Sequence, residues 1–173
     1  MSNKQKIEVW FEEYSDDIYQ FLLYRLGTTD VEDMVQEVFI KALRGIHRFK
    51  GDSAPKTWLY SIARNVALDE LRRRKRNQWK SLLLFETASV KEPATSVSPE
   101  TLYFLSEEQK QVVSAIYSLK SSYQEVLIMR GIKELSVQET ATVLGWTEKK
   151  VRSTHYRAKL ALQEMLGGDQ IDE

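Results

Sequence analysis

The chain lacks the residues on which disulfides, thiol catalysis and many metal sites depend. It has 173 residues, no cysteine and only two histidines, His47 and His155, far apart in the sequence. Without cysteine there are no disulfides, thiol nucleophiles or thiolate metal ligands, as is usual in a reducing compartment. Two separated histidines do not make a histidine-rich metal site. We therefore expect no metal ion, and no other cofactor is indicated.

Long apolar runs are missing as well. The longest runs, such as Leu82–Phe85, are much shorter than the roughly 20 apolar residues that a membrane-spanning helix needs. Residues 1–6 lead into Glu8 and not into the apolar core of a signal peptide. We therefore expect a cytoplasmic protein with no direct membrane insertion.

Glycine and proline are scarce, with seven and three residues. Because 42% of the residues are hydrophobic and 29% are charged, the chain can form a core, and few breaks interrupt its helices. No segment of any length alternates apolar and polar residues with the period of a strand. The sequence therefore predicts an all-α protein without a sheet.

The formal net charge is zero, but the charges are unevenly distributed. Residues 1–40 hold nine acidic and three basic side chains, whereas residues 41–80 hold three acidic and twelve basic ones. A second basic zone, residues 145–160, has five lysines and arginines against one acidic residue. Local basic zones are typical of surfaces that bind nucleic acid, and the acidic start indicates a second, different partner.

Apolar residues recur with helical spacing in three stripes before residue 77. Gly27 is expected to end the first helix, Asp30 to cap the second, and Pro55 to lie in the first turn of the third. The third helix is expected to end in the basic run Arg72–Arg76. The stripes consist of Ile7, Trp10, Phe11, Tyr14, Ile18, Phe21, Leu22 and Leu26; of Val31, Met34, Val35, Val38, Ala42 and Ile46; and of Trp58, Leu59, Ile62, Ala63, Val66, Ala67 and Leu71.

A change of composition separates two helical domains. Ser, Thr, Pro and Glu dominate residues 86–101, where no helical period survives. We therefore divide the chain into a helical domain at 1–80, a flexible linker at 81–105 and a second helical domain at 106–173. Side chains that can cap helices precede the apolar stretches of the second domain; they are Ser106, Ser122, Ser136 and Thr147.

Two helices joined at Gly145 form the most informative local pattern. The first is short, and the second, to about Leu166, opens with basic residues, which is the layout of a helix-turn-helix. Spacing puts Val151, Ala158, Leu162 and Met165 on its core face. The exposed face and its flanks carry groups that bind base edges and phosphates: Lys149, Lys150, Arg152, Ser153, Tyr156 and Arg157. A solvated surface helix in a plain bundle has similar spacing.

Aromatic and basic residues also alternate between residues 49 and 76. Aromatic rings beside cations suit unstacked bases and their phosphates. The helical spacing of Lys56, Tyr60 and Arg64 predicts one exposed stripe, and residues 51–53 form a candidate pocket for an extruded base. Trp58 is equally well explained as a core residue. The candidate DNA-binding residues are Phe49, Lys50, Gly51, Asp52, Ser53, Lys56, Trp58, Tyr60, Arg64, Arg72 and Arg73.

The segment 31–40 combines carboxylates with large apolar side chains. Its polar face holds Asp33, Gln36 and Glu37, with Phe39 and Ile40 beside them. Such a mixture is typical of a protein-docking face. Catalysis by the two carboxylates is not expected, because no metal ligand, nucleophile or phosphate-binding loop accompanies them. The sequence therefore predicts a protein that is not an enzyme.

Four segments carry a resemblance to a known protein family. Residues 31–42 read VEDMVQEVFIKA, residues 49–53 read FKGDS, and residues 56–74 read KTWLYSIARNVALDELRRR. After the linker, residues 135–158 read LSVQETATVLGWTEKKVRSTHYRA. In this order they resemble the extracytoplasmic-function (ECF) class of bacterial RNA polymerase sigma factors. The resemblance covers nearly the whole chain apart from the linker, and it implies two helical domains, region 2 and region 4.

The resemblance assigns a partner to each surface. Region 2 would dock the face at residues 31–40 on the clamp helices of core RNA polymerase. The loop at residues 49–53 and the next helix, including Asn65, would melt the −10 promoter element and hold a flipped base. Region 4 would contact the polymerase flap and read the −35 element through Arg152, Ser153, Tyr156 and Arg157. The protein would start transcription of a stress or envelope-response regulon, with an anti-sigma factor as a further partner and no small-molecule substrate.

Two other classes stay open on the residues alone. A conventional dimeric helix-turn-helix regulator would act without docking on polymerase, and it would not need the second basic and aromatic zone. A nucleic-acid enzyme would need a Ser or Tyr nucleophile with an arginine cluster, or a carboxylate metal site, and no such set stands out.

Overall fold

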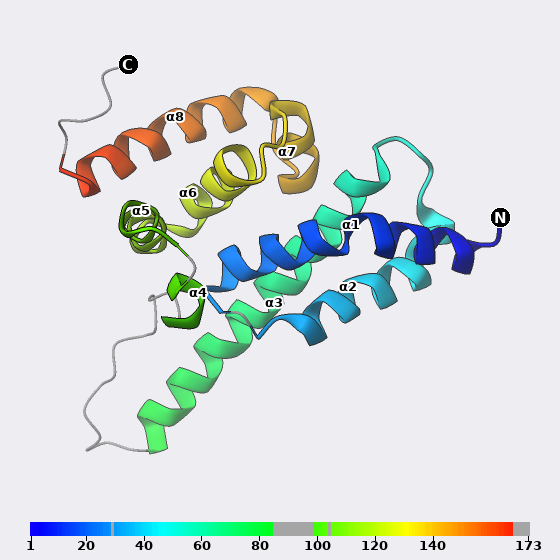
Figure 1. The fold of residues 1–173 in the computed structure, drawn as a ribbon, viewed down its shortest axis with the longest axis horizontal. Helices are drawn as coiled ribbons and strands as arrows, with labels where there is room; N and C mark the ends of the chain where they lie inside the picture. The colour runs from blue at the N-terminus through cyan, green and yellow to red at the C-terminus, as the bar shows by residue number, and fades with distance from the viewer. Residues whose placement is uncertain (29, 85–98, 104, 168–173) are drawn as a thin grey trace.

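The computed structural model describes residues 1–28, 30–84, 99–103 and 105–167, and this part of the chain is helical and contains no strand (Figure 1). The all-α prediction is therefore confirmed for the described residues. The N-terminal bundle consists of α1 (Asn3–Leu26), α2 (Glu32–Gly45), the 3₁₀ turn η1 (Ile46–Arg48) and α3 (Pro55–Leu84). After α4 (Pro99–Tyr103), the C-terminal bundle consists of α5 (Glu107–Ser118), α6 (Ser121–Val126), the π-helical turn η2 (Leu127–Ile132), α7 (Val137–Leu144) and α8 (Glu148–Met165). None of the helices described is both long and apolar enough to span a bilayer.

Local signals set most helix ends in the N-terminal bundle. Gly27 ends α1 in the left-handed conformation (φ 69°), and its N–H donates to the Leu23 carbonyl, as the sequence predicts. The prediction that Asp30 caps α2 is wrong: Val31 occupies the cap position and makes no side-chain cap bond. The Asp30 N–H instead donates to Thr28 Oγ1 at 3.2 Å.

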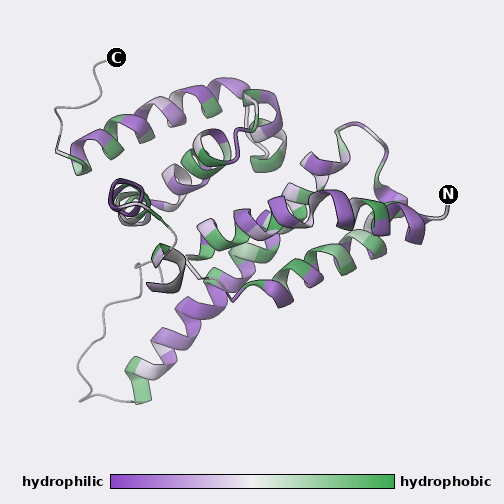
Figure 2. Ribbon diagram, viewed as in Figure 1, coloured by the Kyte–Doolittle hydropathy of each residue, from purple (hydrophilic) through white to green (hydrophobic). Residues whose placement is uncertain are grey.

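α3 is longer than the sequence analysis predicts. It continues past the basic run to Leu84, because residues 77–84 contain neither glycine nor proline to stop it. Residues 81–84, assigned above to the linker, therefore belong to this helix. Figure 2 shows its C-terminal half as mostly hydrophilic up to a hydrophobic last turn. Residues 85–98 and 104 of the predicted linker lie outside the described residues.

Side-chain caps start most helices of the C-terminal bundle. Ser106 forms a complete capping box with Gln109, and Ser136 and Thr147 each accept a bond from a backbone N–H of the first turn. The prediction for Ser122 is wrong, because α6 already begins at Ser121 and Lys120 occupies its cap position. Gly145 ends α7 in the left-handed conformation (φ 67°) and makes the predicted turn into α8.

The two bundles pack against each other through one continuous core. Buried apolar residues of both halves belong to the same large cluster, and a smaller cluster around Ile116, Leu127 and Ala158 lies within the C-terminal bundle. The C-terminal bundle contacts α1 through η2 and α3 through α7, and in Figure 1 the second half of α3 projects away from the other helices. Members from the N-terminal bundle include Ile18, Phe21, Leu22 and Leu59, and members from the C-terminal bundle include Val126, Ile128, Met129, Val143 and Leu144. We call this docked state the closed arrangement.

Candidate nucleic-acid interface

α7 and α8 form a helix-turn-helix whose second helix presents a basic face. Thr147 Oγ1 accepts the Lys150 N–H at 3.1 Å, which fixes the start of α8. Lys150 Nζ lies 4.3 Å from the centre of the Trp146 ring, a cation–π contact that holds the lysine at the turn. Of the predicted contacts, Ser153 is half-buried, with its hydroxyl donating to the Lys150 carbonyl, and the exposed ones are Lys149, Lys150, Arg152, Tyr156 and Arg157.

The buried face of α8 differs in part from the predicted one. Val151 and Ala158 are fully buried as expected, and Thr154 joins them. The prediction for Met165 is wrong: its side chain is exposed in the last turn of α8, which extends past the other helices in Figure 1. His155 is half-buried, and burial, together with the charges of nearby Lys159 and Arg130, lowers its pKa.

An aromatic cluster lies beside the loop that was predicted to hold an extruded base. The Phe49 ring packs 5.0 Å from Trp58 and 5.4 Å from Trp10, measured between ring centroids. Trp58 is therefore half-buried and packs against the core. A surface hollow of about 540 Å³ opens next to the cluster, lined by Met1, Asn3, Lys6, Val9, Trp10, Ile46, His47 and Phe49. Within the loop itself, Ser53 is half-buried and the exposed residues are Lys50, Gly51 and Asp52.

The predicted exposed stripe on α3 is partly covered, by α1 of its own bundle and by the C-terminal bundle. Tyr60 is 0% exposed, so its predicted exposure is wrong in the closed arrangement. The Lys56 ammonium lies 3.3 Å from Asp17 Oδ2, and Arg64 Nε lies 3.1 Å from Glu125 Oε2. The physical reason is tertiary: α1 and α7 pack over the first half of α3.

The rest of the basic surface of α3 stays accessible. Asn65 is exposed, one residue beyond the covered stripe. Arg72 and Arg73 are also exposed, and they pair with Asp69 at 3.3 Å and Glu70 at 2.7 Å on their own helix. Surface ion pairs of this kind are weak, so both guanidinium groups are available to a stronger anion.

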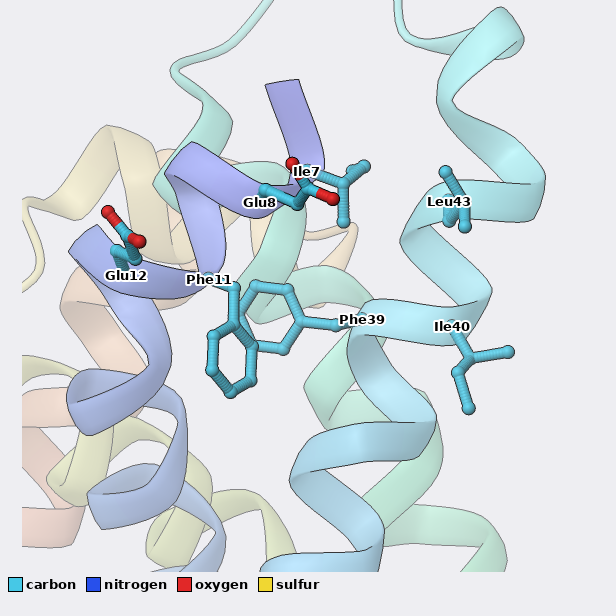
Figure 3. Close-up of a pocket in the computed structure, with 7 residues that line it drawn as sticks. All are labelled: Ile7, Glu8, Phe11, Glu12, Phe39, Ile40 and Leu43. Atoms are coloured by element: carbon cyan, nitrogen blue, oxygen red, sulfur yellow. The ribbon is translucent and has the colours of Figure 1, made fainter. Parts of the chain in front are cut away.

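α2 turns its acidic face to solvent. Asp33, Gln36, Glu37 and Ile40 are exposed, and Ile40 keeps 49% of its surface accessible. Phe39 was predicted to be exposed, but it is 5% exposed, because its ring packs 5.0 Å from the ring of Phe11 on α1 (Figure 3). An apolar groove of about 330 Å³ with an acidic rim lies between α1 and α2, lined by Ile7, Glu8, Phe11, Glu12, Phe39, Ile40 and Leu43.

Sequence analysis missed a buried charge cluster between the bundles. Arg25 donates to Gln124 Oε1 at 2.9 Å and to Ser121 Oγ at 2.7 Å. Its Nη2 lies 3.7 Å from Glu125 Oε1, and both side chains are 4% exposed. Burial lowers the pKa of Arg25, against the opposing charge of Glu125. The sequence signal for this cluster was that Arg25 and Glu125, which carry opposite charges, each lie among apolar residues of a helix.

A second ion pair joins the bundles at Asp17. The Lys133 ammonium lies 3.1 Å from Asp17 Oδ1 and donates to Gln20 Oε1 at 2.6 Å. Burial alone would raise the pKa of Asp17, but the ammonium groups of Lys133 and Lys56 outweigh it and lower the pKa. Asp17 therefore stays ionised at neutral pH and holds a cation from each bundle.

The described residues contain no cluster of three or more His, Asp or Glu side chains that could hold a metal ion. What they do contain is a basic helix-turn-helix and, on the other bundle, a second basic and aromatic surface. Features of this kind are typical of nucleic-acid-binding proteins.

Comparison with known proteins identifies the family. The Sigma-70 region 2 family matches residues 10–77, and the Sigma-70 region 4 family matches residues 109–162. The ECF RNA polymerase sigma factor SigX of Bacillus subtilis is 32% identical over 174 residues, which covers 98% of this chain and 90% of SigX. The ECF RNA polymerase sigma-E factor of Escherichia coli is 37% identical over 140 residues, or 77% of this chain and 72% of that protein. The chain belongs to the ECF RNA polymerase sigma factors.

Solved structures share the fold. The sigma factor RpoE of Bartonella quintana, in a co-crystal with the anti-sigma factor NepR, superposes with a TM-score of 0.75 at 22% identity. That match covers 98% of this chain and 99% of RpoE. CnrH, in complex with the cytosolic domain of CnrY, superposes with a TM-score of 0.67 at 23% identity.

Proposed function

We propose that this sigma factor reads its promoters with two surfaces and docks on core RNA polymerase with a third. The observation that carries the proposal is that three exposed surfaces lie on different elements of one chain: a basic one on α8, a basic and aromatic one on the loop before α3 and on α3, and an acidic one on α2. A conventional dimeric regulator would need only the first of these surfaces. No contact in the described residues favours that alternative.

The exposed face of α8 has the chemistry for reading the −35 element. A guanidinium can bind guanine bidentately, and hydroxyl groups bind base edges or phosphates. Arg152 and Tyr156 are exposed in the first half of α8, with Lys149, Lys150 and Arg157 placed for phosphates. We assign this reading to region 4, proposed at residues 106–173.

The loop at residues 49–53 and α3 have the chemistry for opening the −10 element. An extruded base can stack on the Phe49 and Trp58 rings. Asn65, Arg72 and Arg73 are exposed and available to the DNA strand that carries this base. We assign this role to region 2, proposed at residues 1–80, although α3 continues to Leu84. The 81–105 segment joins the two regions.

The α2 face suits a protein partner. Asp33, Gln36 and Glu37 share one exposed face of α2 with Ile40, a combination of polar and apolar side chains that is typical of interfaces. We propose the clamp helices of core polymerase as its partner and the flap as a contact of region 4. An anti-sigma factor is a further proposed partner, since structural relatives were crystallised with NepR and with CnrY. The chain would act in the bacterial cytoplasm through binding energy alone, not as an enzyme.

A selection experiment tests the proposal. A pool of promoter fragments is retained on the immobilised chain alone, on bacterial core polymerase alone, and on both together. We expect fragments with a common −35 and −10 pattern to be enriched only with both, and Arg152→Ala to abolish the −35 part of that pattern. Tight, sequence-specific retention by the isolated chain would instead support the conventional regulator.

A further inference from the structure

Two arginines of the N-terminal bundle share one carboxylate of the C-terminal bundle. Arg64 Nε lies 3.1 Å from Glu125 Oε2, and Arg25 Nη2 lies 3.7 Å from Glu125 Oε1. The Glu125 and Arg25 side chains are 4% exposed, and Arg64 is 23% exposed. One anionic group therefore neutralises two guanidinium groups, largely out of contact with water.

Removal of the C-terminal bundle would leave two neighbouring cations on the N-terminal one. Like charges at such a separation repel, so the pair favours an anion between them. Guanidinium groups bind carboxylate and phosphate oxygens with the same planar arrangement of donors. Arg64 lies on α3 beside exposed Asn65, within the surface proposed for the −10 element. A phosphodiester of the promoter strand matches that position and charge.

The covering contact also lacks the complete hydrogen bonding of a permanent core. The Tyr60 hydroxyl is buried without a hydrogen-bond partner among the described residues, and so is the hydroxyl of Thr140 on α7. Buried hydroxyl groups without a partner are unfavourable and uncommon. Separation of the bundles would return both groups to water or to a ligand.

The closed arrangement covers part of one nucleic-acid surface and spares the others. Tyr60 and most of Arg64 are covered, whereas Arg152 on α8 and Asp33 and Ile40 on α2 are exposed. Docking on polymerase and −35 contact are thus open to the closed form, whereas DNA contact through Arg25 and Arg64 is not.

We propose that Glu125 occupies the place of a promoter phosphate in the free protein, and that Arg25 and Arg64 bind a DNA phosphodiester once the bundles separate. The inference rests on the proposed function, because it assigns Arg25 to the −10 surface. It makes Glu125 an autoinhibitory residue that competes with DNA. The closed form then engages the −10 strand through Arg25 and Arg64 only after other contacts have drawn the bundles apart.

The first test measures the separation of the two bundles in the absence of DNA. Because the chain has no cysteine, Lys41→Cys on α2 and Lys159→Cys on α8 give two exposed sites for spin labels. We expect one narrow distance distribution in the parent protein and a longer, broader one after Glu125→Gln, which keeps the side-chain shape. Glu164→Gln, an exposed acidic residue near the end of α8, is the control with the same charge change and should leave the distribution narrow. A broad distribution in the parent protein would overturn the proposal.

The second test measures phosphodiester binding without polymerase. The probe is a fluorescein-labelled, mixed-sequence single-stranded DNA of about 12 nucleotides, read by anisotropy. Glu125→Gln should bind it about tenfold more tightly than the parent, since the competent fraction rises. Adding Arg25→Gln to that variant should remove most of the gain, and Glu164→Gln should reproduce little of it. An unchanged affinity in the Arg25→Gln double variant would show that Arg25 is not a DNA ligand.

Both tests stand apart from the proposed function. If transcription fails while opening and single-strand binding respond as described, the sigma assignment of these surfaces fails and the phosphate site survives. If Glu125→Gln does not fold by circular dichroism, Lys133→Gln weakens the same contact from its Asp17 side. That variant should then open the bundles and bind DNA more tightly, and an unchanged distance would overturn the proposal.

Discussion

Substitution of Tyr60 by Phe should make the free protein more stable. The Tyr60 hydroxyl is fully buried between the bundles and has no hydrogen-bond partner among the described residues. Burial, reinforced by the charges of Asp17 and Glu139, raises the pKa of this phenol. The hydroxyl therefore stays protonated, and ionisation does not remove the cost of burying it without a partner. An unpaired buried hydroxyl costs about 1–3 kcal/mol. Because the ring contact with Phe21 at 5.5 Å is kept, we expect Tyr60→Phe to add about 1 kcal/mol to the free energy of unfolding.

Thermal unfolding followed by circular dichroism measures the change. For a chain of this size, 1 kcal/mol corresponds to a rise in Tm of about 2–4 °C. Tyr117→Phe is the matched control, because the Tyr117 hydroxyl is also buried but donates to the Leu23 carbonyl over a long 3.5 Å. That variant should lose stability or leave it unchanged. A Tm that falls after Tyr60→Phe would refute the assignment of an unpaired hydroxyl to the closed arrangement.

Three further predictions concern the proposed surfaces and one titrating group. Ile40→Glu should abolish core polymerase binding in a pull-down while the fold persists; Val112→Glu, on exposed α5, should leave binding intact. Arg152→Ala should weaken specific promoter binding by about 1–3 kcal/mol and relax the preference for one base. Lys150→Ala should weaken binding to all DNA sequences alike and lower the slope of log affinity against log salt concentration by about 1. Burial lowers the pKa of His155, so the unfolded chain takes up its proton at higher pH, and the free energy of unfolding should fall as pH drops below about 6.5. Urea titrations should show that His155→Gln flattens this dependence, and an unchanged slope would contradict it.

Helix ends and the helix-turn-helix could be predicted from sequence because their causes are local. Gly27 and Gly145 both adopt the left-handed conformation that ends a helix, and Ser106 and Thr147 both cap the helix that follows. The spacing along α8 likewise gave the exposed basic face. Each of these features depends on residues within two turns of one another.

The failures concern contacts between elements. Tyr60 was placed on an exposed stripe by helical spacing, and Phe39 was placed on a docking face because it lies beside carboxylates. Each instead packs against another helix, which its own segment does not reveal. The buried pairing of Arg25 with Glu125 joins residues 100 positions apart. Without knowledge of how the bundles dock, a charge on an apolar face has no identifiable partner. The sequence therefore left open whether the two domains pack together, and the closed arrangement is a finding of the structure.

Run-off transcription with bacterial core polymerase on a pool of promoter fragments tests the central claim most directly. With the chain present, we expect specific transcripts that are absent with core polymerase alone. They should disappear with Trp58→Ala, and also with the double variant Arg152→Ala and Arg157→Ala, because −10 opening and −35 reading lie on different bundles. No specific transcript, together with no detectable binding to core polymerase, would contradict the assignment of these surfaces to transcription initiation.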